Sequence, residues 1–314
     1  MIDPVISYLQ LCQLSYQPPK VIPHAVAALH PKGSWKCVWG PAQSADQSNL
    51  AFVAAYYESP GVPAFVVVAI RGTDVAVDAW GVIVQMWEDL DVLDPVAFPW
   101  MPASSGALVA SGTLDGLGVV LQLTDGGQRL LPFLLDFLGK PENREARLVV
   151  TGHSLGGCLT TVVAPWLQVS LGRQGIDNAI VPVTFAGPTA GNPAFAASYS
   201  SSFPASLRYF NSLDVVPLAW ASVESIETIY DPHGLPTPEL VDVAVDTYQG
   251  LMDLLGITYA QPGQDHELPG HFAPSPTSWY EEAYTQHHTT TYMKLLGGKS
   301  VAAEWPRPRL RSRV

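Results

Sequence analysis

Residues 148–157 read Leu148-Val149-Val150-Thr151-Gly152-His153-Ser154-Leu155-Gly156-Gly157. The apolar and β-branched residues before Gly152 predict a buried strand, and the residues after Ser154 continue as an apolar helical pattern. Gly-x-Ser-x-Gly alone is a weak signal, but between a strand and a helix it predicts a sharp turn that exposes the serine. Ser154 is therefore a candidate nucleophile. The alternative is a glycine-rich turn whose serine only caps the helix.

The apolar runs around this turn predict an α/β fold. Strands are expected at residues 49–57, 64–70, 147–151, 179–185 and 207–210, and helices at 114–138, 155–171 and 194–200. Continuous apolar runs suit parallel strands that are covered on both faces. The alternation of strand and helix therefore predicts a mostly parallel central sheet with helices on both faces. Ligands of such sheets bind beyond the carboxyl ends of the strands.

Two segments interrupt this alternation. Residues 74–103 interleave acidic residues with aromatic and methionine side chains, and residues 222–278 hold one helical pattern, 238–255, between loops rich in Pro, Gly and Asp. Neither segment is set apart by a linker. We therefore expect residues 1–314 to form a single domain, with both segments as excursions from it.

The overall composition excludes some classes of partner. The formal net charge is −12, so the chain has few cations to spare for nucleic-acid phosphates. No uninterrupted apolar run reaches the roughly 18 residues of a transmembrane helix. The first residues lack the basic region and apolar run of a secretory signal. The sequence thus predicts no nucleic-acid partner and no transmembrane segment, and it leaves open a cytoplasmic location or export by a non-classical or truncated route.

The three cysteines, Cys12, Cys37 and Cys158, are an odd number and cannot form a complete disulfide framework. A Cys12–Cys37 bridge is the alternative to free thiols, and we expect free thiols. Cys158 falls in the apolar helix after Ser154 and is expected to be a small core residue.

A serine nucleophile needs a base, and the base needs an orienting carboxylate. On this architecture the expected order along the chain is serine, acid, histidine. Asp214 follows the strand expected at 207–210 and is the candidate acid, with Asp231 as its rival. Of the eight histidines, His287 and His288 best satisfy this order, and spacing alone does not choose between them.

Two other histidines offer a different chemistry. His266 and His271 lie near Asp265 and Glu267 in a polar segment and could form a metal site. Their spacing matches no established metal motif, so a solvated loop is the expected structure and no metal is predicted.

A tetrahedral intermediate also needs donors for its oxyanion. The strand expected at 64–70 runs into Arg71-Gly72-Thr73-Asp74, upstream of Ser154 and at another strand's carboxyl end. Thr73 can offer a backbone N–H and a hydroxyl there, and Leu155 can offer the first N–H of the following helix. The alternative is a plain turn in which Asp74 caps a helix.

These motifs together resemble the fungal-type (class 3) triacylglycerol lipase family, a branch of the α/β-hydrolases. The resemblance runs from about residue 50 to 296 and is carried by Ile70-Arg71-Gly72-Thr73, Thr151–Gly157, Thr184-Phe185-Ala186-Gly187-Pro188, Asn211–Pro217 and His287 leading to Tyr292. It implies Ser154 as nucleophile, Asp214 as acid, Thr73 and Leu155 as oxyanion donors, and no metal or organic cofactor.

The resemblance also bears on the base and on residues 74–103. In many members the catalytic histidine precedes a tyrosine by five positions, which here selects His287 before Tyr292. Residues 74–103 correspond in position to the family's lid, the alternative being a surface helix packed on the core. The chain departs from secreted fungal members in lacking a visible signal and a disulfide set, and so looks more like bacterial relatives.

The function implied by the resemblance is hydrolysis of triacylglycerols or other medium- and long-chain acyl esters, at an oil–water interface, through an acyl-enzyme. A phospholipase A1 or a short-chain esterase would use the same chemistry. A non-catalytic lipid-binding relative is disfavoured because each triad role has a candidate. A redox protein using Cys158 is disfavoured because no second cysteine lies nearby in the sequence.

The lid interpretation predicts an effect of the tryptophans in residues 74–103. Opening a lid would expose apolar surface at a cost of several kcal/mol for a few hundred Å², at about 25 cal/mol per Å², which an oil surface can offset. Replacing Trp80 and Trp87 together by serine should therefore weaken hydrolysis of an emulsified ester more than that of a soluble short ester. Equal losses on both substrates would show that these tryptophans serve only the core.

Overall fold

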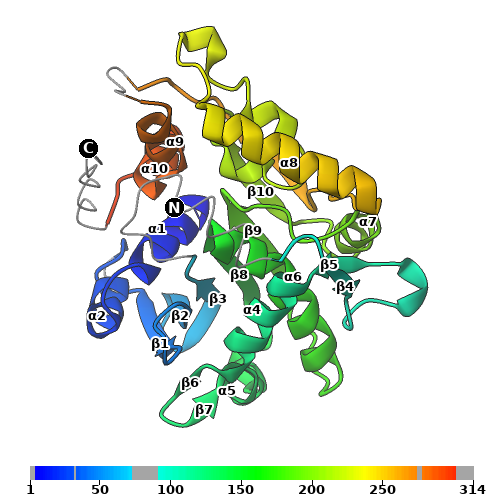
Figure 1. The fold of residues 1–314 in the computed structure, drawn as a ribbon. Coiled ribbons are helices and arrows are strands. Elements are labelled where there is room, and N and C mark those ends of the chain that lie inside the picture. Colours follow the sequence, from blue (N-terminus) through cyan, green and yellow to red (C-terminus); the bar gives the residue numbers. More distant parts are fainter. Residues whose placement is uncertain (1–3, 32, 73–90, 274–277, 302–314) are drawn as a thin grey trace.

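The computed structural model describes residues 4–31, 33–72, 91–273 and 278–301. Its centre is a seven-stranded sheet with the strand order β1-β2-β3-β8-β9-β10-β11 (Figure 1). The strands of this sheet are β1 (Trp35–Gln43), β2 (Leu50–Ser59), β3 (Val62–Ile70), β8 (Arg147–His153), β9 (Ile180–Phe185), β10 (Leu207–Asn211) and β11 (Gln264–Leu268). Two small two-stranded sheets consist of β4 (Pro95–Ala97) with β5 (Leu108–Ala110), and β6 (Thr124–Asp125) with β7 (Gln128–Arg129).

The sheet is mostly parallel, as predicted. Strands β3, β8, β9, β10 and β11 run in the same direction, whereas β1 and β2 form an antiparallel meander that leads into β3. The strand expected at residues 49–57 is therefore β2, which pairs antiparallel with β3. The strands β1 and β11 escaped prediction, β1 because Gly40-Pro41 interrupts its pattern and β11 because four of its five residues are polar.

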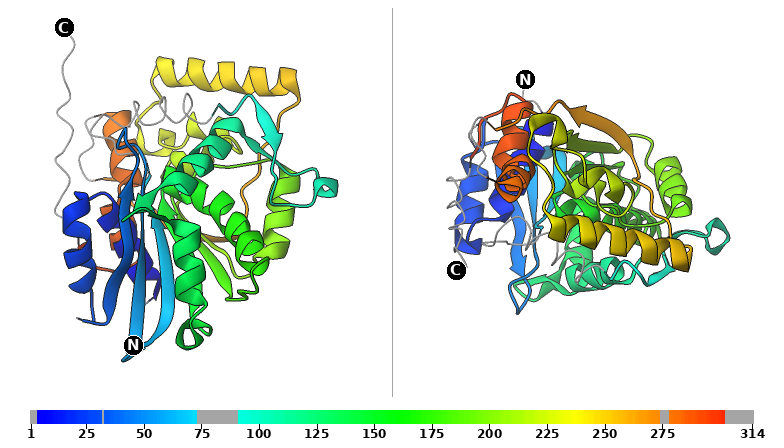
Figure 2. Two further views of the ribbon diagram at one scale, coloured as in Figure 1. Left: turned by 90° about the horizontal axis from the view of Figure 1, so that it is seen from below. Right: turned by 45° about the horizontal axis from the view of Figure 1, so that its top comes forward.

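Helices cover both faces of the sheet, which confirms the predicted layers (Figure 2). One face carries α1 (Pro4–Ser15), α2 (Ile22–Ala27) and α10 (Thr289–Leu295). The other carries α4 (Ser111–Gln122), α5 (Leu130–Leu138), α6 (Leu155–Gly172) and α7 (Pro193–Ser202). The strand β3 shows how the layers are specified, because Val66, Val68 and Ile70 pack against α4–α7 while Val67 and Ala69 pack against α1 and α2.

The single helix predicted at residues 114–138 is wrong. The structure has two helices there, α4 and α5, joined by the short β6–β7 hairpin. Gly126 and Gly127 form its tip with positive φ angles of 54° and 83°, a backbone region that glycine adopts readily. The apolar residues on either side of the glycines continue one helix-like pattern, but the pair Gly126-Gly127 indicates a turn that separates two helices.

The segment 222–278 builds a third apolar cluster beyond the carboxyl ends of the parallel strands. Its main helix is α8 (Glu239–Leu255), as predicted, which lies across this end of the molecule (Figure 1). Val241, Val245 and Tyr248 of α8 pack against residues 215–230 and against α9 (Trp279–His287). The same segment also supplies β11 to the central sheet, so it is integrated with the main core.

The lid-like segment 74–103 is described only in its second half, and residues 74–90 lie outside the described residues. From residue 91 onward the chain packs closely on the domain. Phe98 and Met101 are buried in the cluster formed by α4–α7, and Phe98 meets Phe195 edge-on at 5.4 Å between ring centroids. This described half therefore belongs to the core.

Among the described helices, α6 alone has the length and apolar composition of a membrane span, and 72% of that stretch is buried inside the protein. It is the helix that follows Ser154 and packs on β8 and β9. Its composition is that of a core helix enclosed by other elements.

The three cysteines are free thiols. Cys12 and Cys158 are fully buried, and burial raises the pKa of each thiol to about 12. Burial also raises the pKa of the partly exposed Cys37, to about 11.

These thiols should react poorly with a thiol reagent in the native protein, because the thiolate is the reactive form and is scarce at pH 8. In 5,5′-dithiobis(2-nitrobenzoate) titrations, we expect at most slow reaction at Cys37 without denaturant and reaction of all three thiols in guanidinium chloride. Fewer than three reactive thiols in the denatured, unreduced protein would reveal a disulfide.

Candidate active site

Ser154 occupies a strained turn between β8 and α6. Its backbone angles are φ 60° and ψ −132°, a combination that non-glycine residues rarely adopt. The turn closes only because its neighbours lack side chains. A Cβ on Gly152 would collide with the carbonyl group of Gly156, and a Cβ on Gly156 would collide with the carbonyl oxygen of Ile70 at the end of β3. These close approaches explain the glycines on either side of the serine. Ser154 itself is buried, with 3% of its surface exposed, so the prediction that the turn exposes the serine is wrong.

The turn places Ser154 at the start of α6. Its N–H donates to the carbonyl of Phe185 at 3.0 Å, which ties the turn to β9. The first N–H groups of a helix have no intrahelical carbonyl partner, so the N–H of Leu155 begins α6 without one. Thr73, the other candidate oxyanion donor, lies outside the described residues.

His287 is the last residue of α9, and its side chain reaches Ser154. His287 Nε2 lies 2.9 Å from Ser154 Oγ, and His287 Nδ1 lies 2.9 Å from Asp214 Oδ2. The side chain of Asp214 is fully buried, whereas that of His287 keeps 14% of its surface exposed. The structure therefore brings together three residues that the sequence singled out separately.

Asp214 follows β10 in a turn that supplies it with several donors. Its Oδ1 accepts from the N–H of Val216 at 3.0 Å, and its Oδ2 accepts from the hydroxyl of Tyr292 at 2.7 Å as well as from His287. Burial and the charge of Asp214 raise the pKa of Tyr292 well above its usual value, so this phenol stays protonated and donates. The backbone N–H of Asn211 donates in turn to the phenol oxygen at 3.0 Å.

This pattern of partners fixes the tautomer of His287. A carboxylate can only accept, so His287 Nδ1 carries the proton that points to Asp214. In the neutral ring Nε2 then has a free lone pair, which accepts the hydroxyl proton of Ser154. Such an arrangement can remove the serine proton as the hydroxyl attacks an electrophile, with the charge that develops on the imidazole next to a carboxylate.

His288, the rival base, has a different role. It lies between α9 and α10 with an extended backbone, φ −67° and ψ 138°, which turns the chain away from α9. Its Nδ1 accepts from the N–H of Thr290 at 3.2 Å and so caps α10. Burial, followed by the nearby charges of His287 and Lys294, lowers the pKa of His288 to about 4.

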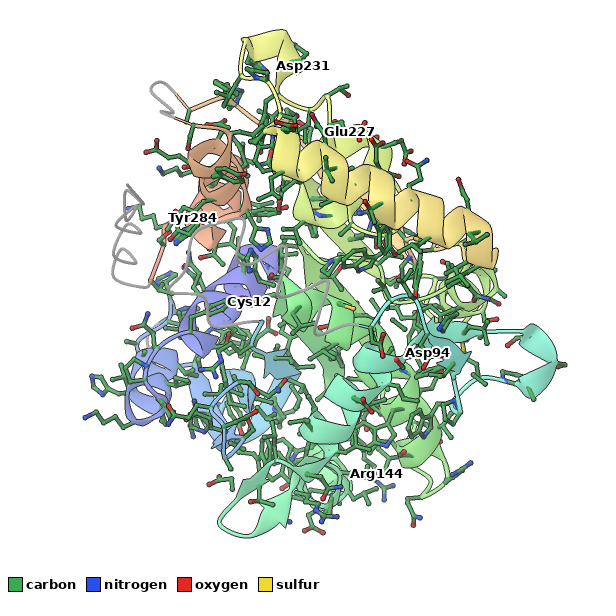
Figure 3. The ribbon with its side chains drawn as sticks, in the orientation of Figure 1. Cys12, Asp94, Arg144, Glu227, Asp231 and Tyr284 are labelled. Carbon is green, nitrogen blue, oxygen red and sulfur yellow. The ribbon has the colours of Figure 1, made fainter. Side chains whose placement is uncertain are left out.

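The other candidates from the sequence do not join this cluster. Asp231 belongs to a single helical turn at the outer tip of the loop before α8 (Figure 3). Asp265 and His266 are consecutive residues of β11 and point to opposite faces of the sheet. Asp265 pairs with Arg208 at 2.7 Å, and His266 stacks on Tyr209. Within the described ranges, no group of three or more His, Cys, Asp or Glu is placed to hold a metal ion.

Two parts of the site were not predicted. Tyr292 was only a spacing marker in the sequence, whereas in the structure it donates to the carboxylate of Asp214. Gln286 joins α9 to the end of β10, because its side-chain oxygen accepts from Asn211 Nδ2 at 2.7 Å. The available signal in the sequence was a polar residue directly before the candidate base, which could not be interpreted before the fold was known.

The chain is similar to lipases of known sequence and known structure. The sequence model of the family Lipase (class 3) matches residues 67–223. Lipase ZK262.3 of Caenorhabditis elegans is 35% identical over 111 residues, which cover 35% of this chain and 31% of that protein. The match thus spans about a third of the curated relative.

Solved structures share the fold over most of the chain. M37 lipase has a TM-score of 0.77 at 24% identity, covering 95% of this chain and 92% of that one. A Rhizomucor miehei lipase in complex with its propeptide has a TM-score of 0.57 at 21% identity, covering 93% and 78%. A triacylglycerol lipase described as having a serine protease triad also has a TM-score of 0.57, at 20% identity, covering 93% and 92%.

At these identities the structural likeness shows the fold, which is that of the α/β-hydrolases. The family is shown by the sequence model, because the matched residues 67–223 make up half of the chain. They include β8, Ser154 and Asp214. The chain belongs to the class 3 lipase family.

Proposed function

We propose that the protein is a serine carboxylic-ester hydrolase that acts on triacylglycerols or other medium- and long-chain acyl esters. The observation that carries this proposal is the hydrogen-bonded chain from Asp214 through His287 to Ser154, with 2.9 Å at each step. Ser154 is the nucleophile, His287 the general base and acid, and Asp214 the group that orients His287.

The reaction proceeds in two halves. Ser154 Oγ attacks the ester carbonyl while its proton passes to His287 Nε2, and the tetrahedral intermediate collapses when His287 returns this proton to the leaving alcohol. Water then attacks the acyl-enzyme with the help of the same base, which releases the fatty acid and restores Ser154. Asp214 stabilises the imidazolium in both halves through its hydrogen bond to Nδ1.

The oxyanion is held by the N–H of Leu155 and by Thr73. Support for Leu155 comes from its place as the first residue of α6, directly after the nucleophile. Support for Thr73 comes from the sequence motif at the end of β3. Loss of one such donor typically costs about 3 kcal/mol of transition-state stabilisation. No step of this mechanism calls for a metal or an organic cofactor.

An apolar acyl chain suits the surroundings of these residues. Leu155, the residue after the nucleophile, is partly buried and packs against both the third apolar cluster and the core around α6, so apolar surface borders Ser154. A lid at an oil–water interface is also proposed, and it excludes residues 91–103 of the segment 74–103 because these pack on the core. A phospholipase A1 or a short-chain esterase would use the same three residues and would differ in the preferred ester.

The mechanism predicts the behaviour of three variants. Ser154→Ala, Asp214→Ala and His287→Ala should each lower kcat by about 10⁴-fold or more, because each breaks the same proton-transfer unit, and combining them should add little. The measurement is steady-state hydrolysis of p-nitrophenyl esters of graded chain length, which also separates a lipase from a short-chain esterase.

His288→Ala is the matched control for His287→Ala. It should keep kcat within a few-fold of the wild-type value, while the loss of the cap of α10 should lower stability by about 1 kcal/mol. If His288→Ala abolishes activity and His287→Ala does not, the base is assigned to the wrong residue. If wild type hydrolyses no ester of any chain length, the proposal of catalysis itself fails.

A further inference from the structure

His153, the residue before the nucleophile, is connected to the base in a way that the mechanism above does not use. Its Nε2 lies 2.8 Å from the backbone carbonyl oxygen of His287. The side chain of His287 reaches back to Ser154, the next residue along the chain from His153. The two histidine rings are tilted by 38° to each other, with 4.7 Å between their centroids. The chain segment His153-Ser154 is therefore hydrogen-bonded to His287 twice, once through the His287 carbonyl and once through the His287 side chain.

The backbone carbonyl of His287, which His153 binds, lies at the C-terminal end of α9 and needs a hydrogen-bond donor from outside the helix. His287 is the last residue of α9, and the final carbonyls of a helix have no partner within it. Because the chain turns away at His288, the end of α9 is held from outside the helix. His153 thus binds the backbone of the residue whose side chain must meet Ser154 Oγ.

The tautomer of His153 follows from these partners. A carbonyl oxygen only accepts, so His153 Nε2 carries the proton, and Nδ1 of a neutral ring must accept. The hydroxyl of Tyr16 lies 3.1 Å from Nδ1 and can donate to it, and the same hydroxyl lies 3.3 Å from the backbone carbonyl oxygen of His153. The ring is buried, and burial, followed by the charge of His287, lowers the pKa of His153 well below its usual value. His153 therefore stays neutral beside a base that becomes positively charged during turnover.

Tyr16 is itself fixed by the N-terminal helix α1. This helix packs on β3 and β8. Cys12, which is labelled in Figure 3 and lies one turn before Tyr16, belongs to it. Its Sγ lies 3.5 Å from Thr151 Oγ1 of β8. Gln13 reaches Thr289 at the start of α10 over 3.5 Å. The end of α1 therefore lies between the strand that carries the nucleophile and the chain that follows the base. Residues 4–16 lie outside the part of the chain that matches the family model.

We propose that Tyr16 and His153 are positioning residues that hold the backbone of His287 in register with Ser154, through the hydrogen bonds from Tyr16 Oη to His153 Nδ1 and from His153 Nε2 to the His287 carbonyl. This inference rests on the proposed roles of Ser154 and His287. It assigns to the N-terminal segment a part in catalysis, because Tyr16, the residue directly after α1, supplies the hydroxyl that fixes the tautomer of His153.

The test compares four variants by kcat and KM on a soluble p-nitrophenyl ester. Tyr16→Phe should lower kcat about fivefold, the usual net effect of one hydrogen bond, and His153→Leu about 100-fold, as expected when the base is displaced. His153→Gln should recover to within about fivefold of wild type, since its side-chain amide can donate to the same carbonyl. KM should stay within about twofold throughout, because the expected effect is a displacement of the base and not a loss of substrate binding.

Tyr8→Phe is the matched control. Tyr8 is a buried tyrosine within α1, packed edge-on against Phe65 and away from His153, so the kcat of Tyr8→Phe should equal that of wild type. The unfolding temperature of each variant separates positioning from stability. The inference is overturned if His153→Leu keeps wild-type kcat, if His153→Gln loses as much as His153→Leu, or if the losses appear in KM.

Wild type and Ser154→Ala, measured alongside, keep the two proposals distinguishable. If wild type is inactive or Ser154→Ala is active, the proposed function fails. If wild type is active, Ser154→Ala is not, and the Tyr16 and His153 variants match wild type, only the positioning role fails.

Discussion

The 2.9 Å hydrogen bond between Ser154 Oγ and His287 Nε2 joins residues that are 133 positions apart in the sequence. The positions of Ser154 and His287 are fixed by different parts of the structure. At one end, the strained backbone of Ser154 is imposed by β8 and α6, and it is sterically allowed because Gly152 and Gly156 have no side chains. At the other end, α9 stops at His287, and the side chain of His287 is oriented by the buried carboxylate of Asp214. A displacement of about 1 Å at either end would be costly for catalysis.

The parallel sheet explains why these distant residues meet. Strands β3, β8, β9 and β10 end at the same edge, so the turns after them converge there. The turn after β8 carries Ser154 and the turn after β10 carries Asp214. His287 does not follow a strand directly and depends on packing: Tyr292 of α10 is buried between the sheet and α1 and donates to Asp214, and Gln286 binds the end of β10. The site is therefore assembled from both layers of the domain.

Much of this arrangement could be predicted from the sequence, for a physical reason. Buried parallel strands need continuous apolar runs, and the turn at Ser154 needs glycines, so both leave strong local signals. The polar edge strand β11 and the hairpin that splits α4 from α5 leave weak ones. The choice of His287 over His288 came from family resemblance, because two adjacent histidines differ only in where the helix ends. The contacts of Tyr16 and His153 depend on how α1 packs, which no local pattern encodes.

The assignment of Ser154 as nucleophile is tested most directly by covalent trapping. Incubation with diethyl p-nitrophenyl phosphate, followed by digestion and mass spectrometry, should place one diethylphosphoryl group on Ser154, with loss of esterase activity in proportion to labelling. The same reagent should label His287→Ala far more slowly, because Ser154 then lacks its base. A stoichiometric adduct on another residue, or complete inactivation without an adduct on Ser154, would contradict the account.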